Sequence, residues 1–131
     1  MPDIDDRERA RILVVDDHPD TLMLMDRLLR MDGDYEVITA ANSAEAVAAA
    51  RGGRLSLFII DIGLPDGSGV ALLGQLLKHG PCKAVALTGH SMASDIKQYK
   101  EAGFDGWLIK PVHPDLLLST VKQILDDGKG D

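Results

Sequence analysis

The sequence predicts an α/β fold in which five parallel strands form one sheet, doubly wound with helices on both faces as a three-layer (βα)5 sandwich. Short apolar segments alternate five times with longer segments whose apolar residues recur at helical spacing. Strands joined by crossover helices form parallel sheets, and the right-handed preference of such crossovers leaves few topologies. With 131 residues, 45% of them hydrophobic, the chain is long enough for one domain with its own core.

In chain order, the expected strands are 11–15, 35–39, 55–60, 83–87 and 105–109, and the expected helices are 19–32, 43–52, 70–79, 91–102 and 114–126. The first strand is an apolar run that ends at Asp16. In the helix after it, Leu22, Met25 and Leu29 fall on one face. Pro19 suits the first position of that helix, because its missing N–H is harmless there.

The later elements carry their own start and stop signals. The alanine-rich second helix follows either a capping box of Asn42 and Glu45 or a cap by Ser43. The third strand is a continuous apolar run, typical of a strand buried on both faces, and the glycine-rich segment 63–69 after it is not expected to continue a strand or begin a helix at once. Gly103 suits a left-handed end of the fourth helix, and Pro114 opens the fifth.

Composition narrows the classes of function. No apolar stretch approaches the length of a membrane span, and the N-terminus lacks the character of a signal peptide. The single cysteine, Cys82, cannot form an internal disulfide, which suits a cytoplasmic location and a small buried filler near a strand. The formal charge of −7 argues against direct binding of nucleic acid. We expect no contact with a membrane either.

Polar residues stand at the ends of four predicted strands. Asp16 and Asp17 follow the first strand, Asp61 follows the third, Thr88 the fourth and Lys110 the fifth. A single aspartate at a strand end is more often a cap or a turn residue than a functional group. However, open α/β sheets place their ligands at the carboxyl ends of the strands, where all five groups would meet. The combination therefore predicts a site.

The charges of these groups indicate the chemistry of the site. Three carboxylates repel one another in a confined space unless a cation intervenes, and hard oxygen ligands suit Mg²⁺ (or Mn²⁺) better than zinc. Lys110, the hydroxyl of Thr88 and the N–H of Gly89 are expected to hold phosphoryl oxygens. Asp61 is then the candidate nucleophile, since carboxylates form acyl phosphates in other phosphoryl-transfer systems.

Four segments together resemble the receiver domains of two-component response regulators, both the chemotaxis type and those of hybrid kinases. They are Val14–Asp17, Asp61–Gly69, Ala86–Gly89 and Leu108–Pro111. The resemblance is ordered and correctly spaced, and it covers residues 10–127, which we expect to form the receiver domain. It implies a flavodoxin-like sandwich, and residues 1–9 and 128–131 are expected to be flexible ends.

The resemblance also implies a role for each residue at the site. Asp61 would accept the phosphoryl group from a phosphohistidine. Asp17 would bind Mg²⁺ directly and Asp16 through water or more loosely, and the backbone carbonyl of Gly63 would complete the protein's share of the metal shell. Lys110 would pair with the Asp61 carboxylate and then with the phosphoryl group.

The remaining implied roles concern the switch and the loops. Thr88 would move toward the phosphoryl group and carry the switch. The Lys110–Pro111 peptide bond would be cis, and Gly69 would close the loop after the acceptor. Small Gly89 would leave room for the phosphoryl group. The two variable positions that flank the site are Gly63 and His90, and the latter is expected to be a solvated loop histidine.

Trp107 departs from the family pattern. Relatives carry Tyr or Phe three residues before the lysine, whereas an indole is larger and has a donor N–H but no hydroxyl. Two interpretations stand side by side: an altered or blocked form of the usual coupling with Thr88, or an exposed aromatic residue that binds a partner.

The expected function is therefore a Mg²⁺-dependent phosphoacceptor switch, a signalling domain rather than an enzyme. Its partners would be a sensor histidine kinase or a histidine phosphotransfer protein, and a downstream effector protein or a fused output domain. The first turn of helix 19–32 would help dock the kinase. A stand-alone receiver, a receiver of a hybrid kinase and the front of a transcription factor would share this sequence pattern.

Three alternatives carry less weight. A phosphorylation-independent scaffold usually loses an acidic residue, the acceptor or the lysine, and this chain keeps them all. A phosphatase with an aspartate nucleophile typically needs a second carboxylate two residues later as general acid, and this chain has Gly63 there. Cofactor binding like that of flavodoxin lacks its phosphate-cradling loop after the first strand.

Overall fold

The computed structural model describes residues 9–33, 35–89 and 93–129. The helices are α1 Pro19–Asp32, α2 Ser43–Ala50, α3 Gly69–Leu77, α4 Ala93–Ala102 and α5 Pro114–Lys129. The strands are β1 Arg11–Val15, β2 Glu36–Ala40, β3 Leu57–Asp61, β4 Gly63–Leu64, β5 Gly67–Ser68, β6 Lys83–Thr88 and β7 Gly106–Ile109. Among the described residues, no helix is both long enough and apolar enough to span a membrane.

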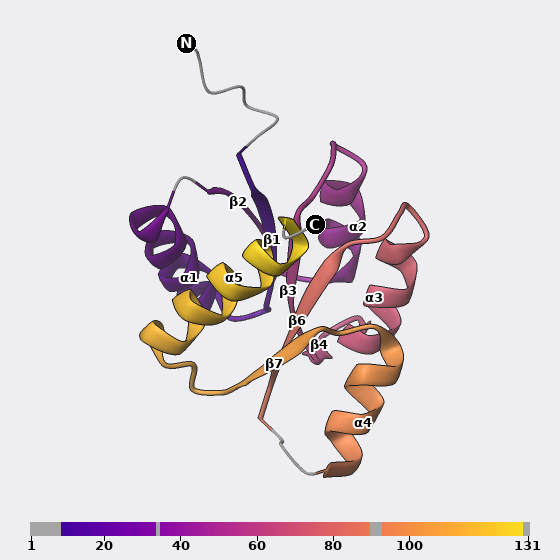
Figure 1. Ribbon diagram of the computed structural model, residues 1–131. Coiled ribbons are helices and arrows are strands. Elements are labelled where there is room, and N and C mark those ends of the chain that lie inside the picture. Colours follow the sequence, from indigo (N-terminus) through magenta and orange to yellow (C-terminus); the bar gives the residue numbers. More distant parts are fainter. Residues whose placement is uncertain (1–8, 34, 90–92, 130–131) are drawn as a thin grey trace.

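Five of the strands form one parallel sheet in the order β2-β1-β3-β6-β7 (Figure 1). β3 lies at the centre, and all five of its residues are buried. The chain moves outward from β1 to β2 and then crosses over to β3, so the strand order reverses beside β1 and β3. This reversal is the switch point at which doubly wound sheets form ligand sites, and the predicted fold class is confirmed.

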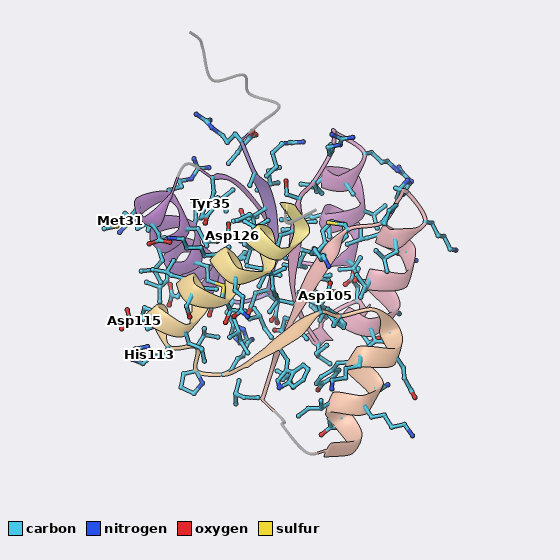
Figure 2. All side chains as sticks on the ribbon, in the orientation of Figure 1. Met31, Tyr35, Asp105, His113, Asp115 and Asp126 are labelled. Atoms are coloured by element: carbon cyan, nitrogen blue, oxygen red, sulfur yellow. The ribbon has the colours of Figure 1, made fainter. Side chains whose placement is uncertain are left out.

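Alternating side chains of each strand enter two separate cores. On one face, Leu13, Phe58 and Ala86 pack against α2, α3 and α4. On the other face, Val14, Ile59 and Leu87 pack against α1 and α5. The helices that cover each face are visible in Figure 1, and Figure 2 shows the outer surface of α1, where Met31 is 84% exposed. Both faces of the sheet are therefore covered, as the continuous apolar runs predict.

The boundaries differ from the sequence prediction by one to three residues. β2 lies at Glu36–Ala40 instead of 35–39, β3 begins two residues later than expected, and α2 ends at Ala50 rather than 52. α5 continues to Lys129, three residues beyond the expected end. The expected start of the fourth helix at 91 lies outside the described residues. Helix ends depend on fraying and packing more than on residue type, so such shifts are ordinary.

The cap of α2 was left open by the sequence, and the structure resolves it. The side chain of Asn42 accepts a hydrogen bond of 2.8 Å from the Glu45 N–H, and the Glu45 carboxylate accepts one of 2.8 Å from the Ala41 N–H. Asn42 is therefore the cap and satisfies one N–H of the first turn, whereas the Glu45 carboxylate reaches the residue before the cap instead of the Asn42 N–H that a capping box would use.

As predicted, β3 does not continue beyond Asp61 and α3 begins only at Gly69, but the glycine-rich segment between them forms a hairpin that was not predicted. β4 and β5 continue the extended chain for two residues each and pair antiparallel, with Gly63 opposite Ser68. The turn between them brings Gly67 to φ +152°, a conformation that favours glycine. α3 follows directly, with the Ser68 hydroxyl accepting 3.0 Å from the Ala71 N–H. A hairpin this short leaves no periodicity in the sequence from which to predict it.

Candidate functional site

The sheet places four of the predicted residues, Asp16, Asp61, Thr88 and Lys110, at one edge. Val15 pairs with Ile60, so the next residues along the chain, Asp16 and Asp61, lie side by side at the ends of neighbouring strands. Asp61 lies opposite Leu87, and Thr88 opposite Ile109, which brings the ends of β6 and β7 to the same edge. The carboxyl ends of parallel strands meet there, as the strand-end pattern predicts.

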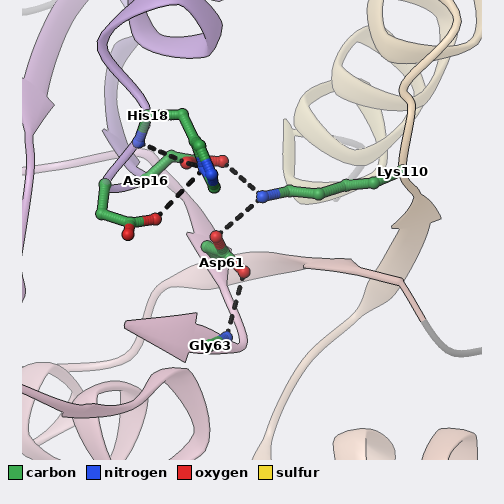
Figure 3. A network of polar contacts seen from close by, with 6 residues as sticks. Asp16, His18, Asp61, Gly63 and Lys110 are labelled. Atoms are coloured by element: carbon green, nitrogen blue, oxygen red, sulfur yellow. Dashed lines mark hydrogen bonds and ion pairs between the residues drawn. The ribbon is translucent and has the colours of Figure 1, made fainter. Parts of the chain in front are cut away.

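Lys110 joins the two buried carboxylates of this edge (Figure 3). Its Nζ lies 2.7 Å from Asp61 Oδ2 and 2.8 Å from Asp16 Oδ2. Asp16 is fully buried, Asp61 is 6% exposed, and the Lys110 side chain is 26% exposed. Burial alone would raise the pKa of Asp16, but the nearby ammonium of Lys110 and the hydrogen bonds from His18 outweigh it and lower that pKa. Burial alone would likewise lower the pKa of Lys110, and its two carboxylate partners raise it instead.

His18 belongs to this site, a position that the sequence analysis missed. Its backbone N–H donates to Asp16 Oδ1 at 2.9 Å, and its Nδ1 lies 2.9 Å from the same oxygen and 3.2 Å from Asp17 Oδ1. The hydrogen bond to Asp16 and the charges of both aspartates raise the pKa of His18. It is also the residue that precedes α1.

The loop that follows Asp61 contacts it through backbone groups. The Gly63 N–H donates to Asp61 Oδ1 at 3.0 Å, and the Gly69 N–H donates to the Ile62 carbonyl at 2.8 Å. A Cβ on Gly69 would lie only 2.3 Å from the carbonyl oxygen of Asp61, so this close approach requires glycine. The role expected of Gly69 in closing the loop is thereby given a steric basis.

The same loop is also bonded to α2, through a residue further along the chain than Asp61. The Asp66 carboxylate accepts hydrogen bonds of 2.9 Å and 3.2 Å from the N–H groups of Ser43 and Ala44. The bond from Ser43 is the main reason why the pKa of Asp66 is lowered. The first turn of α2 and the hairpin beyond Asp61 are therefore held together by a charge at a helix N-terminus.

Thr88 and Trp107 lie on the α4 side of the site. The Thr88 hydroxyl is 2.8 Å from the Tyr99 hydroxyl, and both residues are 3% exposed. Trp107 is half-buried against the core that α4 covers, with Lys100 Nζ 5.5 Å from the centre of its ring. Tyr99 is a second residue that the sequence analysis missed, because only the packing of α4 brings it to Thr88.

The other predicted positions are placed as follows. The Lys110–Pro111 bond is cis, as expected. Gly89 is exposed and follows β6, and a Cβ there would meet nothing within 4 Å. The Gly63 N–H donates a hydrogen bond to the Asp61 carboxylate, and metal binding by the Gly63 carbonyl stays a prediction. His90 lies outside the described residues.

The donor groups suit a divalent cation. Ligand atoms of Asp16, Asp17, His18 and Asp61 all lie within 4.8 Å of one another. Asp16 Oδ2 is buried and faces only the ammonium of Lys110, without a well-directed hydrogen bond among the described residues. Several carboxylate oxygens with excess negative charge are the donor set that Mg²⁺ prefers, so the residues fit the predicted ion.

Comparison with known proteins points to one family. Residues 12–122 match the response regulator receiver domain. The transcriptional regulatory protein KdpE of Mycobacterium tuberculosis is 35% identical over 111 residues, which are 85% of this chain and 49% of KdpE. PrrA of the same organism is 35% identical over 116 residues, or 88% of this chain and 49% of PrrA. The chain thus spans about half the length of these curated relatives.

Solved structures agree with this assignment. A CheY-like receiver domain of Methanospirillum hungatei has a TM-score of 0.87 and 34% identity, covering 94% of this chain and 98% of the other. TrrA of Thermotoga maritima, in complex with Mg²⁺ and beryllium fluoride, has a TM-score of 0.77 and 33% identity, covering 88% and 98%. With the strand-end site in place, this chain belongs to the receiver domains of two-component response regulators, which are signalling domains.

Proposed function

We propose that this chain is a Mg²⁺-dependent phosphoacceptor switch, in which Asp61 takes a phosphoryl group from a phosphohistidine. The observation that supports it most is the single ammonium of Lys110 within 2.8 Å of two buried carboxylates on adjacent strands. A lysine so placed neutralises part of the charge at rest and is ready to pair with a phosphoryl oxygen. The proposed location is the cytoplasm.

The transfer makes one bond and breaks one bond. An Asp61 carboxylate oxygen attacks phosphorus, the P–N bond to the donor histidine breaks, and the electron pair of that bond stays on the imidazole. Asp16, Asp17, Asp61 and the Gly63 carbonyl would hold Mg²⁺, which offsets charge on the phosphoryl oxygens when bound. Lys110 would leave Asp16 to pair with the phosphoryl group, and Thr88 would donate its hydroxyl hydrogen there.

A groove beside the site suits the phosphodonor partner. It lies between α1 and α5 and is lined by Leu24, Met25, Leu28, Val112 and Leu117, with His18 and Lys110 at the end nearest Asp61. Leu24 and Leu116 are 51% and 53% exposed on the same two helices. Apolar side chains around a charged reactive centre would seat a helix of a sensor histidine kinase or of a histidine phosphotransfer protein. An effector protein or an output domain would read the result.

The test is chemical phosphorylation followed by intact mass. The protein is incubated with Mg²⁺ and acetyl phosphate or phosphoramidate, beside Asp61→Asn and beside Asp66→Asn, which alters a carboxylate of the same loop. We expect one added phosphoryl group on the parent and on Asp66→Asn, lost on standing, and none on Asp61→Asn. Normal labelling of Asp61→Asn would move the acceptor elsewhere, and a folded parent without any adduct would favour a phosphorylation-independent scaffold.

A further inference from the structure

Tyr99 makes a contact that the proposed phosphoacceptor chemistry does not account for. Its hydroxyl lies 2.8 Å from the hydroxyl of Thr88, the residue that ends β6 at the edge of the site. Tyr99 comes from α4, eleven residues further along the chain. Each of the two side chains is 3% exposed, so this hydrogen bond is shielded from solvent.

The surroundings of Tyr99 make the bond costly to lose. Its ring stands edge-on to Phe104, with centroids 6.3 Å apart at 81°, inside the apolar core under α3 and α4. A phenol hydroxyl in such surroundings needs a hydrogen-bond partner, because a buried hydroxyl that has lost its hydrogen bonds to water and gained none in the protein destabilises the fold. Thr88 supplies that partner and thereby ties the end of β6 to the inner face of α4.

A phosphoryl group on Asp61 would compete for the same hydroxyl. Either hydroxyl can be the donor of the bond between Thr88 and Tyr99, whereas a phosphoryl oxygen only accepts, so Thr88 would have to direct its one hydrogen to the phosphoryl group. To reach the phosphoryl group, the Thr88 side chain has to turn away from the Tyr99 hydroxyl. The Tyr99 hydroxyl is then without this partner unless α4 shifts to give it another.

We propose that Tyr99 is a positioning residue that holds the Thr88 hydroxyl on the α4 side of the site and opposes its movement to the phosphoryl group. Phosphorylation is thereby linked to α4, because the two states compete for one hydroxyl. This inference rests on the proposed phosphoacceptor function of Asp61.

The contacts of Trp107 support α4 as the element that responds. Trp107 is already half-buried against the same core, and the ammonium of Lys100 lies 5.5 Å from its ring centre. An indole N–H only donates, so Trp107 cannot accept the hydrogen of Thr88 as the Tyr99 hydroxyl can. Adjacent residues of α4, Tyr99 and Lys100, therefore fasten the helix to β6 and to β7.

The test measures binding of beryllium fluoride with Mg²⁺, a stable mimic of the phosphoryl group, by titration calorimetry. Tyr99→Phe removes only the hydroxyl and keeps the ring against Phe104. Tyr35→Phe is the matched control, since Tyr35 packs near α1 on the opposite face of the sheet (Figure 2). Both changes are also made in the Thr88→Val background, where no hydroxyl is left to restrain.

We expect Tyr99→Phe to tighten binding about two- to tenfold, the range set by the net worth of one hydrogen bond. Tyr35→Phe should bind as the parent does, and Tyr99→Phe should have no effect in the Thr88→Val background. Urea unfolding of the parent, Thr88→Val, Tyr99→Phe and the double variant, without any ligand, should show that the effects of the two changes on unfolding free energy are not additive.

Three results would overturn the inference. Unchanged or weaker binding by Tyr99→Phe would mean that the tyrosine does not oppose Thr88. An equal gain in the Thr88→Val background would show that the variant acts by loosening α4 rather than through the hydroxyl. If the parent binds no beryllium fluoride and takes no phosphoryl group, the proposed function itself fails and this inference with it.

Discussion

Replacing Gly69 by alanine tests how the loop after Asp61 is built. The new Cβ would lie 2.3 Å from the carbonyl oxygen of Asp61 and 2.9 Å from the Cα of Ile62. Carbon atoms keep at least 3.0 Å from such neighbours, so backbone must move. The Gly69 N–H also donates to the Ile62 carbonyl at 2.8 Å, and the same shift would strain that bond. We expect a loss of about 2–3 kcal/mol in unfolding free energy.

Gly74 provides a control on the same helix. It is exposed in the middle of α3, and a Cβ there would meet nothing within 4 Å. Alanine at this position should stabilise the protein by about 0.5–1 kcal/mol, because alanine is the better helix former. Urea unfolding should therefore separate the two single-methyl variants by about 3 kcal/mol, with opposite signs relative to the parent.

The rate of phosphorylation provides a second comparison of Gly69→Ala and Gly74→Ala. The atom that Gly69→Ala would push is the backbone carbonyl oxygen of Asp61, the proposed acceptor, so labelling by acetyl phosphate should slow well beyond any loss of folded protein. Gly74→Ala should label at the parent rate. If Gly69→Ala is as stable as the parent, or gains stability as Gly74→Ala does, the steric account of the acceptor loop is wrong.

Three further outcomes follow from the charges and burial at and near the site. Lys110→Met should lower the unfolding free energy by about 1–3 kcal/mol without Mg²⁺, because two facing carboxylates lose their cation. In urea titrations, Mg²⁺ should restore part of this lost stability. No recovery with Mg²⁺ would argue against a cation site. Since the pKa of Asp16 is lowered from 3.8, its ionised form stabilises the fold above that pH, and the contribution is lost as pH falls through the lower value. The stability gap between parent and Asp16→Asn should therefore narrow in acid, and a gap that widens would contradict the sign. Burial, followed by the charge of Asp105, raises the pKa of Cys82 to about 12, so alkylation by iodoacetamide at pH 8 should be slow until urea is added; rapid alkylation of the folded protein would contradict it.

Strong periodic signals in the sequence were enough to predict the main elements. The apolar runs gave all five strands of the large sheet within two residues, because burial on both faces leaves a continuous pattern. Asn42, the cap of α2, was a local signal that the sequence also carried. The hairpin of β4 and β5 was missed because two-residue strands have no period to detect.

The site shows the same division between strand ends and long-range packing. Asp16, Asp61 and Lys110 were predicted to meet because a parallel sheet gathers its strand ends, and they do. His18 was not predicted at the site, since nothing in the sequence shows that its ring turns back to the aspartates. Tyr99 could not be found either, because its partner depends on how α4 packs on the sheet.

β3, which ends at Asp61, is the central and most protected strand of the large sheet. β3 is hydrogen-bonded on both sides, to β1 and to β6, and none of its five residues is exposed. Amides of such a strand exchange with deuterium only when the whole domain opens, whereas elements at the margin of a sheet open locally at lower free energy. We therefore expect the carboxylate of Asp61 to lie on a strand that opens only with the whole domain, while marginal elements that open at lower free energy would carry the change to partners.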